Sequence, residues 1–299
     1  MKTLAKLAFV TAALFYATAG AAQDNARDDL EQLKIAAMES LVAAPPERAL
    51  PLVNKVLSGD HSDELKERAL FILSQIDDDT AQATLLDFAK DSNGNLQSEA
   101  IRMIGIGGNK ASLDNLNSIY ATGAPDVREA VLVAFLIAGD KRALFNIAVN
   151  AQGDDFEEAV EMLGAMGARD ELRELLSQAG PSEALIKAYM ISGDIEELRR
   201  VALDDSNPAL QVEAIEAMGV VGGEEVNATL VQIYKDAKSD DIRDAALKGM
   251  MISGNDAGIL ELYRATDDAA AKKEMLEYLV IMDSDDIWNI IDAALDGDQ

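Results

Sequence analysis

One short pattern recurs along most of the chain and constrains its fold more than any other feature. A small residue follows a charged residue and precedes an apolar run, as in Ser98–Gly105 (SEAIRMIG) and Val212–Gly219 (VEAIEAMG). The small residue recurs at steps of 31, 30, 29, 25, 30 and 31 residues, at Ala69, Ala100, Ala130, Ala159, Ala184, Ala214 and Ala245. A weaker eighth copy covers Lys273–Ile281. Self-similarity at this period indicates stacked structural repeats.

Each copy has the same internal plan of two amphipathic helices. Apolar residues stand at helical spacing in the first helix, as at Ile101 and Ile104, and in the second, as at Leu113 and Leu116. Glycines follow the first helix, and we expect them to end it, because glycine accepts the left-handed backbone of a helix end. No segment shows convincing strand alternation, so the sequence predicts an all-α protein.

The copies also alternate in type. The second, fourth and sixth copies end their first helix in a Leu/Ile/Met-Gly-x-x-Gly pattern (IGIGG, LGAMG, MGVVG). The third, fifth and seventh end in IAGD, ISGD and ISGN, and we expect Asp140, Asp194 and Asn255 to cap the next helix. The underlying unit is therefore predicted to be a pair of copies with four helices.

These starts and stops resemble the HEAT-repeat family in its short bacterial, HEAT-like form. The resemblance rests on two motifs of the first helix, which begins with Pro/Asp-x-x-Arg/Glu-x-Ala and ends with Leu-Gly-x-x-Gly. It extends from His61 to the C-terminus. A tetratricopeptide array is the alternative, but its period is longer and its aromatic signature is missing. The resemblance implies a right-handed α-solenoid of about seven to eight antiparallel helix pairs. It also implies protein binding on the concave face.

A stack of this kind needs capped ends and close contacts between helices. We therefore assign residues 61–299 to the HEAT-like solenoid and residues 23–60 to N-terminal capping helices. The recurring alanines are predicted to be the points where neighbouring helices approach most closely.

Residues 1–22 are predicted to be a secretory signal peptide. Lys2 and Lys6 precede a short apolar stretch, Leu7–Tyr16, and small residues lead to a cleavage site near Ala21 or Ala22. The apolar run is shorter than the roughly 20 residues of a membrane-spanning helix. We expect a periplasmic or secreted protein.

Composition narrows the functions further. The 299 residues include 54 acidic and 26 basic side chains, for a net charge of −28, and cleavage of the signal peptide would remove two lysines and give −30. Such a surface repels nucleic acid and anionic membranes, so we predict neither as a partner, nor direct membrane insertion. No cysteine and one histidine exclude disulfides, thiol nucleophiles and multi-histidine metal centres. Without any catalytic motif, we predict no catalytic, cofactor or metal site, and no enzyme.

Charged residues recur at equivalent positions of the copies. Glu99, Glu129, Glu158 and Glu213 all precede the small residue. They form either a solvated helix face or a ladder of acids that binds cations. The segment Asp91–Asn95 has some features of a calcium loop, but its glycine is misplaced and the final glutamate is absent. Arginines in first helices, at Arg102, Arg128 and Arg243, are expected to pair with acids of neighbouring copies.

Three tyrosines are the candidate partner-binding residues. Tyr120 and Tyr234 each follow their repeat alanine by 20 residues, and Tyr263 lies close to the same position. They either pack between layers or form a row of amphipathic anchors, because tyrosine is enriched at interface hot spots.

The sequence thus predicts a non-enzymatic exported scaffold or adaptor. Its partner would be a protein or peptide with a basic patch, bound through a face of the solenoid and released by salt. Two alternatives stay open: a modifying-enzyme subunit similar to HEAT-like phycobilin lyases, and a soluble subunit of an envelope complex.

Overall fold

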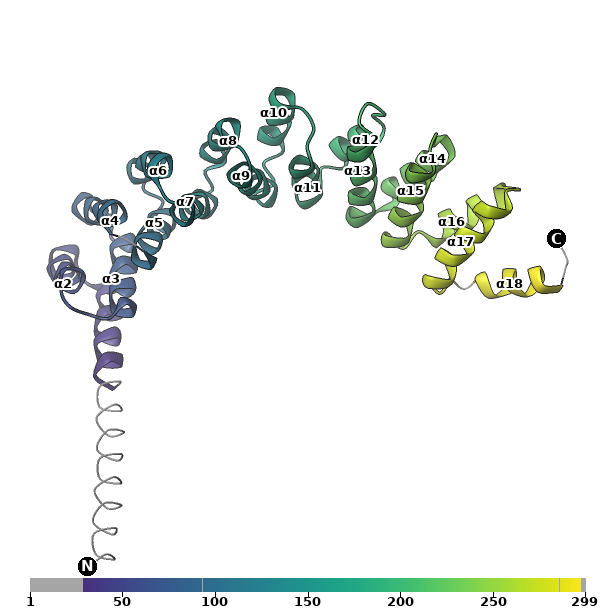
Figure 1. Ribbon diagram of the computed structural model, residues 1–299. Coiled ribbons are helices and arrows are strands. Elements are labelled where there is room, and N and C mark those ends of the chain that lie inside the picture. The colour runs from purple at the N-terminus through teal and green to yellow at the C-terminus, as the bar shows by residue number, and fades with distance from the viewer. Residues whose placement is uncertain (1–28, 93, 285, 297–299) are drawn as a thin grey trace, which may run out of the picture. The chain divides into compact units, whose positions relative to one another are not determined.

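The computed structural model describes residues 29–92, 94–284 and 286–296, which form helices and connecting turns without any strand (Figure 1). The predicted all-α fold class is therefore confirmed, and the stacking of successive helices described below is consistent with the predicted solenoid of HEAT-like repeats. None of the helices in these residues is long and apolar enough to cross a membrane. The predicted signal peptide, residues 1–22, lies outside the described residues.

The chain divides into two compact units, Met1–Ala138 and Gly139–Gln299, called unit 1 and unit 2 below. Unit 1 begins with a helix over 29–39 and a 3-10 helix, η1 (Ser40–Ala43). Its remaining helices are α2 (Pro46–Ser58), α3 (Asp63–Gln75), α4 (Asp79–Asp91), α5 (Asn95–Gly107), α6 (Lys110–Thr122) and α7 (Pro125–Ala138). The segments before α3 belong to the predicted capping region, residues 23–60, whose capping role stays a prediction.

Unit 2 continues the same alternation of helices. Its helices are α8 (Lys141–Asn150), α9 (Asp154–Ala165), α10 (Arg169–Ala179), α11 (Glu183–Ser192), α12 (Ile195–Ala202), α13 (Pro208–Val221), α14 (Glu224–Asp236), α15 (Asp240–Ile252), α16 (Asp256–Ala265), α17 (Ala269–Ile281) and α18 (Ile287–Asp296).

Within each unit the helices form two layers. The helices that carry the recurring small residue pack against one another: α3, α5 and α7 in unit 1, and α9, α11, α13, α15 and α17 in unit 2 (Figure 1). We call this the first-helix layer. The intervening helices pack beside it as the second-helix layer, with contacts such as those of α8 with α10 and of α14 with α16. Each helix pair thereby buries its apolar stripe against its neighbours.

Three glycines inside first helices allow two backbones to approach closely. A Cβ atom added at Gly219 would lie 2.6 Å from the Cα atom of Gly249, and one at Gly105 would lie 2.6 Å from the carbonyl oxygen of Ala134. At Gly164 the nearest atom would be the Cα of Ala188, at 2.9 Å. The tight helix pairs are therefore α5 with α7, α9 with α11, and α13 with α15.

These glycines do not end their helices, contrary to the sequence-based expectation. Gly105, Gly164 and Gly219 lie within α5, α9 and α13, and only the last glycine of each Gly-x-x-Gly motif follows the helix. Those later glycines have the positive φ angles that only glycine adopts freely, such as 65° at Gly108 and 60° at Gly167. The first glycine of the motif thus allows two helices to pack closely, and the last one ends the helix.

The equivalent position in the alternate copies holds a large side chain. Phe135, Tyr189 and Met250 each stand five residues after their repeat alanine, as Gly105, Gly164 and Gly219 do, and all three are fully buried. Glycine and a bulky residue therefore alternate at one position along the stack. This alternation is the structural counterpart of the predicted four-helix unit.

The recurring alanines are not the points of closest approach. Five of them are buried, but Ala130 and Ala184 are only half-buried. The closest backbone contacts lie five residues later, at the glycines, because only a residue without a Cβ atom lets two helices approach that closely.

Helix caps follow the prediction at two of three positions. Asp140 accepts a hydrogen bond from the backbone N–H of Ala143 at 2.9 Å, and Asn255 accepts one from Gly258 at 3.0 Å. Asp194 occupies the same position before α12 but caps nothing. Its carboxylate instead accepts a hydrogen bond from Arg173 at 2.9 Å, which the sequence did not reveal.

Replacing Gly219 with alanine tests the close contact. Alanine ordinarily stabilises a helix interior relative to glycine by about 0.5–1 kcal/mol. Here the added methyl group meets the backbone of Gly249, so we expect the free energy of unfolding to fall by about 1–3 kcal/mol. Denaturant unfolding followed by circular dichroism measures the difference. Val220→Ala is the control, since Val220 is 58% exposed and should change stability by about 0.5 kcal/mol or less. A Gly219→Ala protein as stable as the parent would contradict the role of the contact.

Candidate functional site

A row of carboxylates runs along the exposed side of the first-helix layer in unit 2. Each member immediately precedes the small residue of its copy, or Met275 in the eighth copy. The members in α11, α13, α15 and α17 are Glu183, Glu213, Asp244 and Glu274, which we call the acidic row. Because these helices pack side by side, the repeat places one acid on each successive helix.

The acidic row continues the predicted ladder. The structure places Glu99 on α5 and Glu129 on α7 in unit 1, and Glu158 on α9 and Glu213 on α13 in unit 2. Glu183, Asp244 and Glu274 were missed, although they share the same offset from the repeat position. Within the described residues, no group of three or more carboxylate or histidine side chains is arranged to hold a metal ion.

Cross-helix ion pairs neutralise neighbouring charges but leave the row acidic. Lys187 Nζ lies 2.7 Å from Glu161 Oε2, and Lys248 Nζ lies 2.9 Å from Glu216 Oε1. Both pairs join the same helices that approach through glycine, α9 with α11 and α13 with α15. Each lysine is thus held by an acid outside the row.

Like charges act on the acids of the row. Burial raises the pKa of Glu213, and repulsion from Glu183 and Glu216 raises it further. Burial also raises the pKa of Glu274, with repulsion from Asp244, Asp240 and Glu277, against a smaller opposing effect of Arg243. The free protein therefore holds negative charge on this face at an energetic cost.

Asp244, a third member of the row, accepts a hydrogen bond from a tyrosine. The Tyr278 hydroxyl of α17 donates a hydrogen bond to Asp244 Oδ1 of α15 at 2.9 Å. Burial and this hydrogen bond raise the pKa of Tyr278 to about 12. Asp244 therefore has a neutral hydrogen-bond donor on the neighbouring helix. At the other end of the row, Glu183 and Glu213 line a groove together with acids of α9.

Two of the three arginines pair within their own helix and not, as expected, with acids of neighbouring copies. Arg102 pairs with Glu99 and Arg243 with Asp240, in each case three residues earlier on the same helix. Arg128 donates to the carbonyl oxygen of Gly123 at 3.4 Å, at the end of the preceding helix. Acids on their own helices thus engage the long side chains of Arg102 and Arg243. Ion pairs between copies use other residues, such as Lys235 with Glu261 at 2.6 Å.

The predicted tyrosines lie on the second-helix layer, on α6, α14 and α16. All three are half-buried. Tyr234 borders a groove that Glu274 also lines, and burial raises its pKa. The Lys272 ammonium lies 5.3 Å from the ring centroid of Tyr263. Tyr120 belongs to unit 1, apart from the acidic row, and a role of the three in partner binding stays a prediction.

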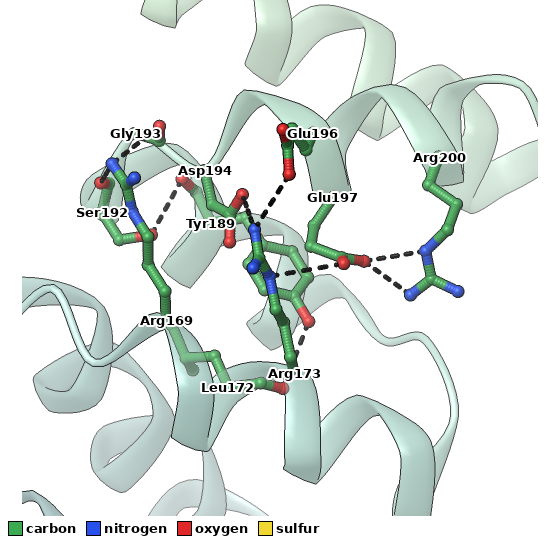
Figure 2. A network of polar contacts seen from close by, with 10 residues as sticks. All are labelled: Arg169, Leu172, Arg173, Tyr189, Ser192, Gly193, Asp194, Glu196, Glu197 and Arg200. Atoms are coloured by element: carbon green, nitrogen blue, oxygen red, sulfur yellow. Dashed lines mark hydrogen bonds and ion pairs between the residues drawn. The ribbon is translucent and has the colours of Figure 1, made fainter.

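A polar network ties α10 to the turn between α11 and α12 (Figure 2). The Arg173 guanidinium lies between three acids, 2.9 Å from Asp194, 3.4 Å from Glu196 and 3.5 Å from Glu197. Asp194 is 2% exposed, so Arg173 compensates a buried charge. The network occurs where the copies are only 25 residues apart.

Two further side chains secure the same turn. Arg169 donates to the carbonyl oxygens of Ser192 at 2.9 Å and Gly193 at 3.1 Å, which satisfies the end of α11 (Figure 2). The buried Tyr189 hydroxyl donates to the carbonyl oxygen of Leu172 at 3.2 Å. These contacts hold the shortened copy in place, and we assign them a structural role.

Comparison with known proteins supports the repeat assignment. Residues 50–136 match the model of the family described as HEAT repeats, which confirms the resemblance seen in the sequence. The chain is similar to the complex of CpcE and CpcF of phycocyanin lyase from Nostoc sp. PCC7120, with 19% identity, a TM-score of 0.35, and coverage of 78% of this chain and 94% of that chain. It is also similar to human deoxyhypusine hydroxylase in complex with glycerol, with 16% identity, a TM-score of 0.32, and coverage of 76% and 98%. No curated protein matches the sequence.

These comparisons correct the prediction that the chain is not an enzyme. Both structures bear the names of enzymes, one a lyase and one a hydroxylase. Stacked helices can bring together side chains from different repeats, so the lack of a short catalytic motif does not exclude catalysis. At this level of similarity neither name assigns an activity to this chain.

Removal of the Arg173 guanidinium tests the network. Arg173→Met leaves the Asp194 carboxylate buried without its ionic partner, and we expect a loss of about 2–4 kcal/mol in the free energy of unfolding. Denaturant unfolding measures it. Lys238→Met is the matched control, because it removes the same charge from an exposed pair with Asp205 and should leave the stability nearly unchanged. Equal losses in the two variants would contradict the assigned role.

Neutralising Glu213 tests whether burial and like charges in the acidic row destabilise the folded state. The folded-state pKa of Glu213 is raised, so protonation favours the folded state, and stability is lost as the pH rises through that value. We expect Glu213→Gln to unfold at a higher temperature than the parent at pH 7, and the difference to vanish near pH 4. Solvent screening keeps the gain small, at about 0.5 kcal/mol or less. Thermal melts at the two pH values check this, with Glu224→Gln on α14 as the control. A destabilised Glu213→Gln protein at pH 7 would contradict the interpretation.

Proposed function

We propose that this HEAT-repeat protein is exported and binds a basic protein or peptide through the exposed face of the first-helix layer in unit 2. The observation that carries the proposal is the acidic row, Glu183, Glu213, Asp244 and Glu274, with one carboxylate on each of four neighbouring helices. Residues 1–22, with their two lysines and short apolar run, support export.

The electrostatics of this face support a cationic partner. The pKa values of Glu213 and Glu274 are raised by burial and by neighbouring acids, so an approaching positive charge removes repulsion as well as adding attraction. The net charge of −28 extends the attraction beyond the contact surface and speeds association with basic partners. The same field repels nucleic acid and anionic lipid.

Export is tested by fractionation of cells that produce the full chain. We expect the protein in the periplasmic or secreted fraction, shortened by cleavage near Ala21 or Ala22, as mass spectrometry of its N-terminus would show. If the protein is recovered with the membranes and released by salt, the result would instead support a soluble subunit bound to an envelope complex. An uncleaved protein in the cytoplasm would contradict export.

Partner binding is tested by capture on the immobilised protein from a periplasmic extract, at about 0.05 M and about 0.5 M salt. We expect a basic protein to be retained at low salt and released at high salt. The variant Glu213→Gln/Glu274→Gln should retain less of it, because two of the four charges of the acidic row are removed.

The control variant Glu224→Gln/Asp267→Asn loses the same charge elsewhere on unit 2 and should retain the partner fully. Equal retention by the two variants would show that net charge, and not the acidic row, attracts the partner. No retained protein at low salt would contradict the proposal as a whole.

A further inference from the structure

A second row on the same helices of unit 2 is apolar and exposed. Four large aliphatic side chains at the C-terminal ends of α11, α13, α15 and α17 face solvent. They are Ile191 (41% exposed), Val220 (58%), Ile252 (46%) and Ile281 (71%), which we call the apolar row. One such side chain alone is unremarkable, but one on each of four neighbouring helices is a recurring feature of this layer.

The apolar row and the acidic row share one face of each helix. Val220 follows Glu213 by seven residues, and Ile191 follows Glu183 by eight. The same intervals of eight and seven residues separate Asp244 from Ile252 and Glu274 from Ile281. Side chains seven or eight residues apart stand on one side of an α-helix, two turns from each other. The exposed face therefore carries acids toward the N-terminal ends and aliphatic groups at the C-terminal ends.

The spacing of the apolar row suits a helix laid across it. Packed helices lie about 8–10 Å apart, so four side chains on the successive helices α11, α13, α15 and α17 would span roughly 25–30 Å. Residues seven apart on an α-helix rise about 10.5 Å. A helix with an apolar residue in each heptad would thus meet successive members of the row.

Charge decides which helix fits. A second copy of this chain would bring its own acidic row against Glu213 and Glu274, and an anionic lipid surface would be repelled in the same way. A helix with lysine or arginine beside its apolar stripe fits both rows at once. Its apolar stripe covers the aliphatic groups, and its cations lie beside the acids.

We propose that the apolar row of unit 2 docks a basic amphipathic helix of the partner, with apolar side chains on Val220 and Ile252 and cations on the acidic row. This inference rests on the proposed function and names the kind of partner segment that the surface takes. Burial of the aliphatic groups under the partner helix then supplies most of the affinity. The ion pairs beside them fix the position of the partner helix along the row.

The test uses two synthetic peptides of about 22 residues, long enough as a helix to span the row. The amphipathic peptide carries leucines at heptad spacing with flanking lysines, and the hydrophilic peptide has serine at every leucine position and the same charge. Fluorescence anisotropy with the purified protein measures both affinities. We expect the amphipathic peptide to bind about tenfold or more tightly than the hydrophilic one, because it alone covers the apolar row.

Variants locate the binding. Val220→Ser/Ile252→Ser should reduce the affinity for the amphipathic peptide to that for the hydrophilic peptide. The control Leu203→Ser removes an aliphatic group that is 60% exposed elsewhere on unit 2, and should leave the affinity unchanged. Because all these side chains are exposed, the variants should fold, as thermal melts would verify.

The outcomes separate this inference from the proposed function. Equal binding of both peptides, weakened by Glu213→Gln/Glu274→Gln but not by Val220→Ser/Ile252→Ser, would overturn the docking role of the apolar row and leave the proposed function standing. Binding of neither peptide at low salt would overturn both. Loss of binding in Leu203→Ser would place the docking surface elsewhere and overturn the inference.

Discussion

The close contact between helix backbones at glycine is the constraint on which the rest of unit 2 depends. Gly219 of α13 faces Gly249 of α15, and Gly164 of α9 faces Ala188 of α11, at distances that leave no room for a Cβ atom. Two helices held this closely leave little freedom in their rotation about their own axes. The contact therefore determines which side of each helix is buried and which side faces solvent.

The surface features follow from that fixed rotation. The ion pairs Glu161–Lys187 and Glu216–Lys248 join the two tight helix pairs of unit 2. Between the tight pairs, the buried Tyr189 of α11 stands at the repeat position that glycine occupies in the adjoining copies, and its hydroxyl reaches α10. Small and large residues thus alternate in the interior, while the acids of the row occupy one repeat position. The exposed aliphatic groups stand alternately seven and six residues after the repeat position, so recurring sequence positions become rows on the surface.

The sequence predicted the helices better than it predicted their contacts. Helix order followed from apolar periodicity, because each copy repeats the same signal. The role of Gly105, Gly164 and Gly219 did not follow, since sequence alone does not show whether glycine serves a positive φ angle or a close approach. The pairing of Asp194 with Arg173 depends on the shortened copy, which brings an arginine of α10 to a position where other copies form a helix cap. Long arginine side chains such as Arg243 can reach several acids, so their partners could not be assigned by position in the repeat.

Part of the candidate site could have been predicted from the sequence. The acids that the sequence analysis found immediately precede the small residue of their copies; they are Glu99, Glu129, Glu158 and Glu213. The same position is acidic in three further copies, at Glu183, Asp244 and Glu274. The 25-residue step and the weaker eighth copy obscured these matches. The apolar row was harder to find, because Ile191 and Ile252 look like ordinary members of an amphipathic stripe until burial is known.

The placement of charge separates a binding surface from a mere aid to solubility. Solubility requires only that acids be spread over the surface, and spread acids repel one another least. Here Glu213 and Glu274 stand among other acids, and burial and repulsion raise their pKa values, so the folded state is destabilised where the acidic row lies. Lysines are available on the same face, but Lys187 and Lys248 pair with Glu161 and Glu216 instead of the row. Repulsion that the fold leaves uncompensated is relieved when a cation arrives. The same carboxylates that lower the stability of the free chain would therefore strengthen the proposed complex with a basic partner.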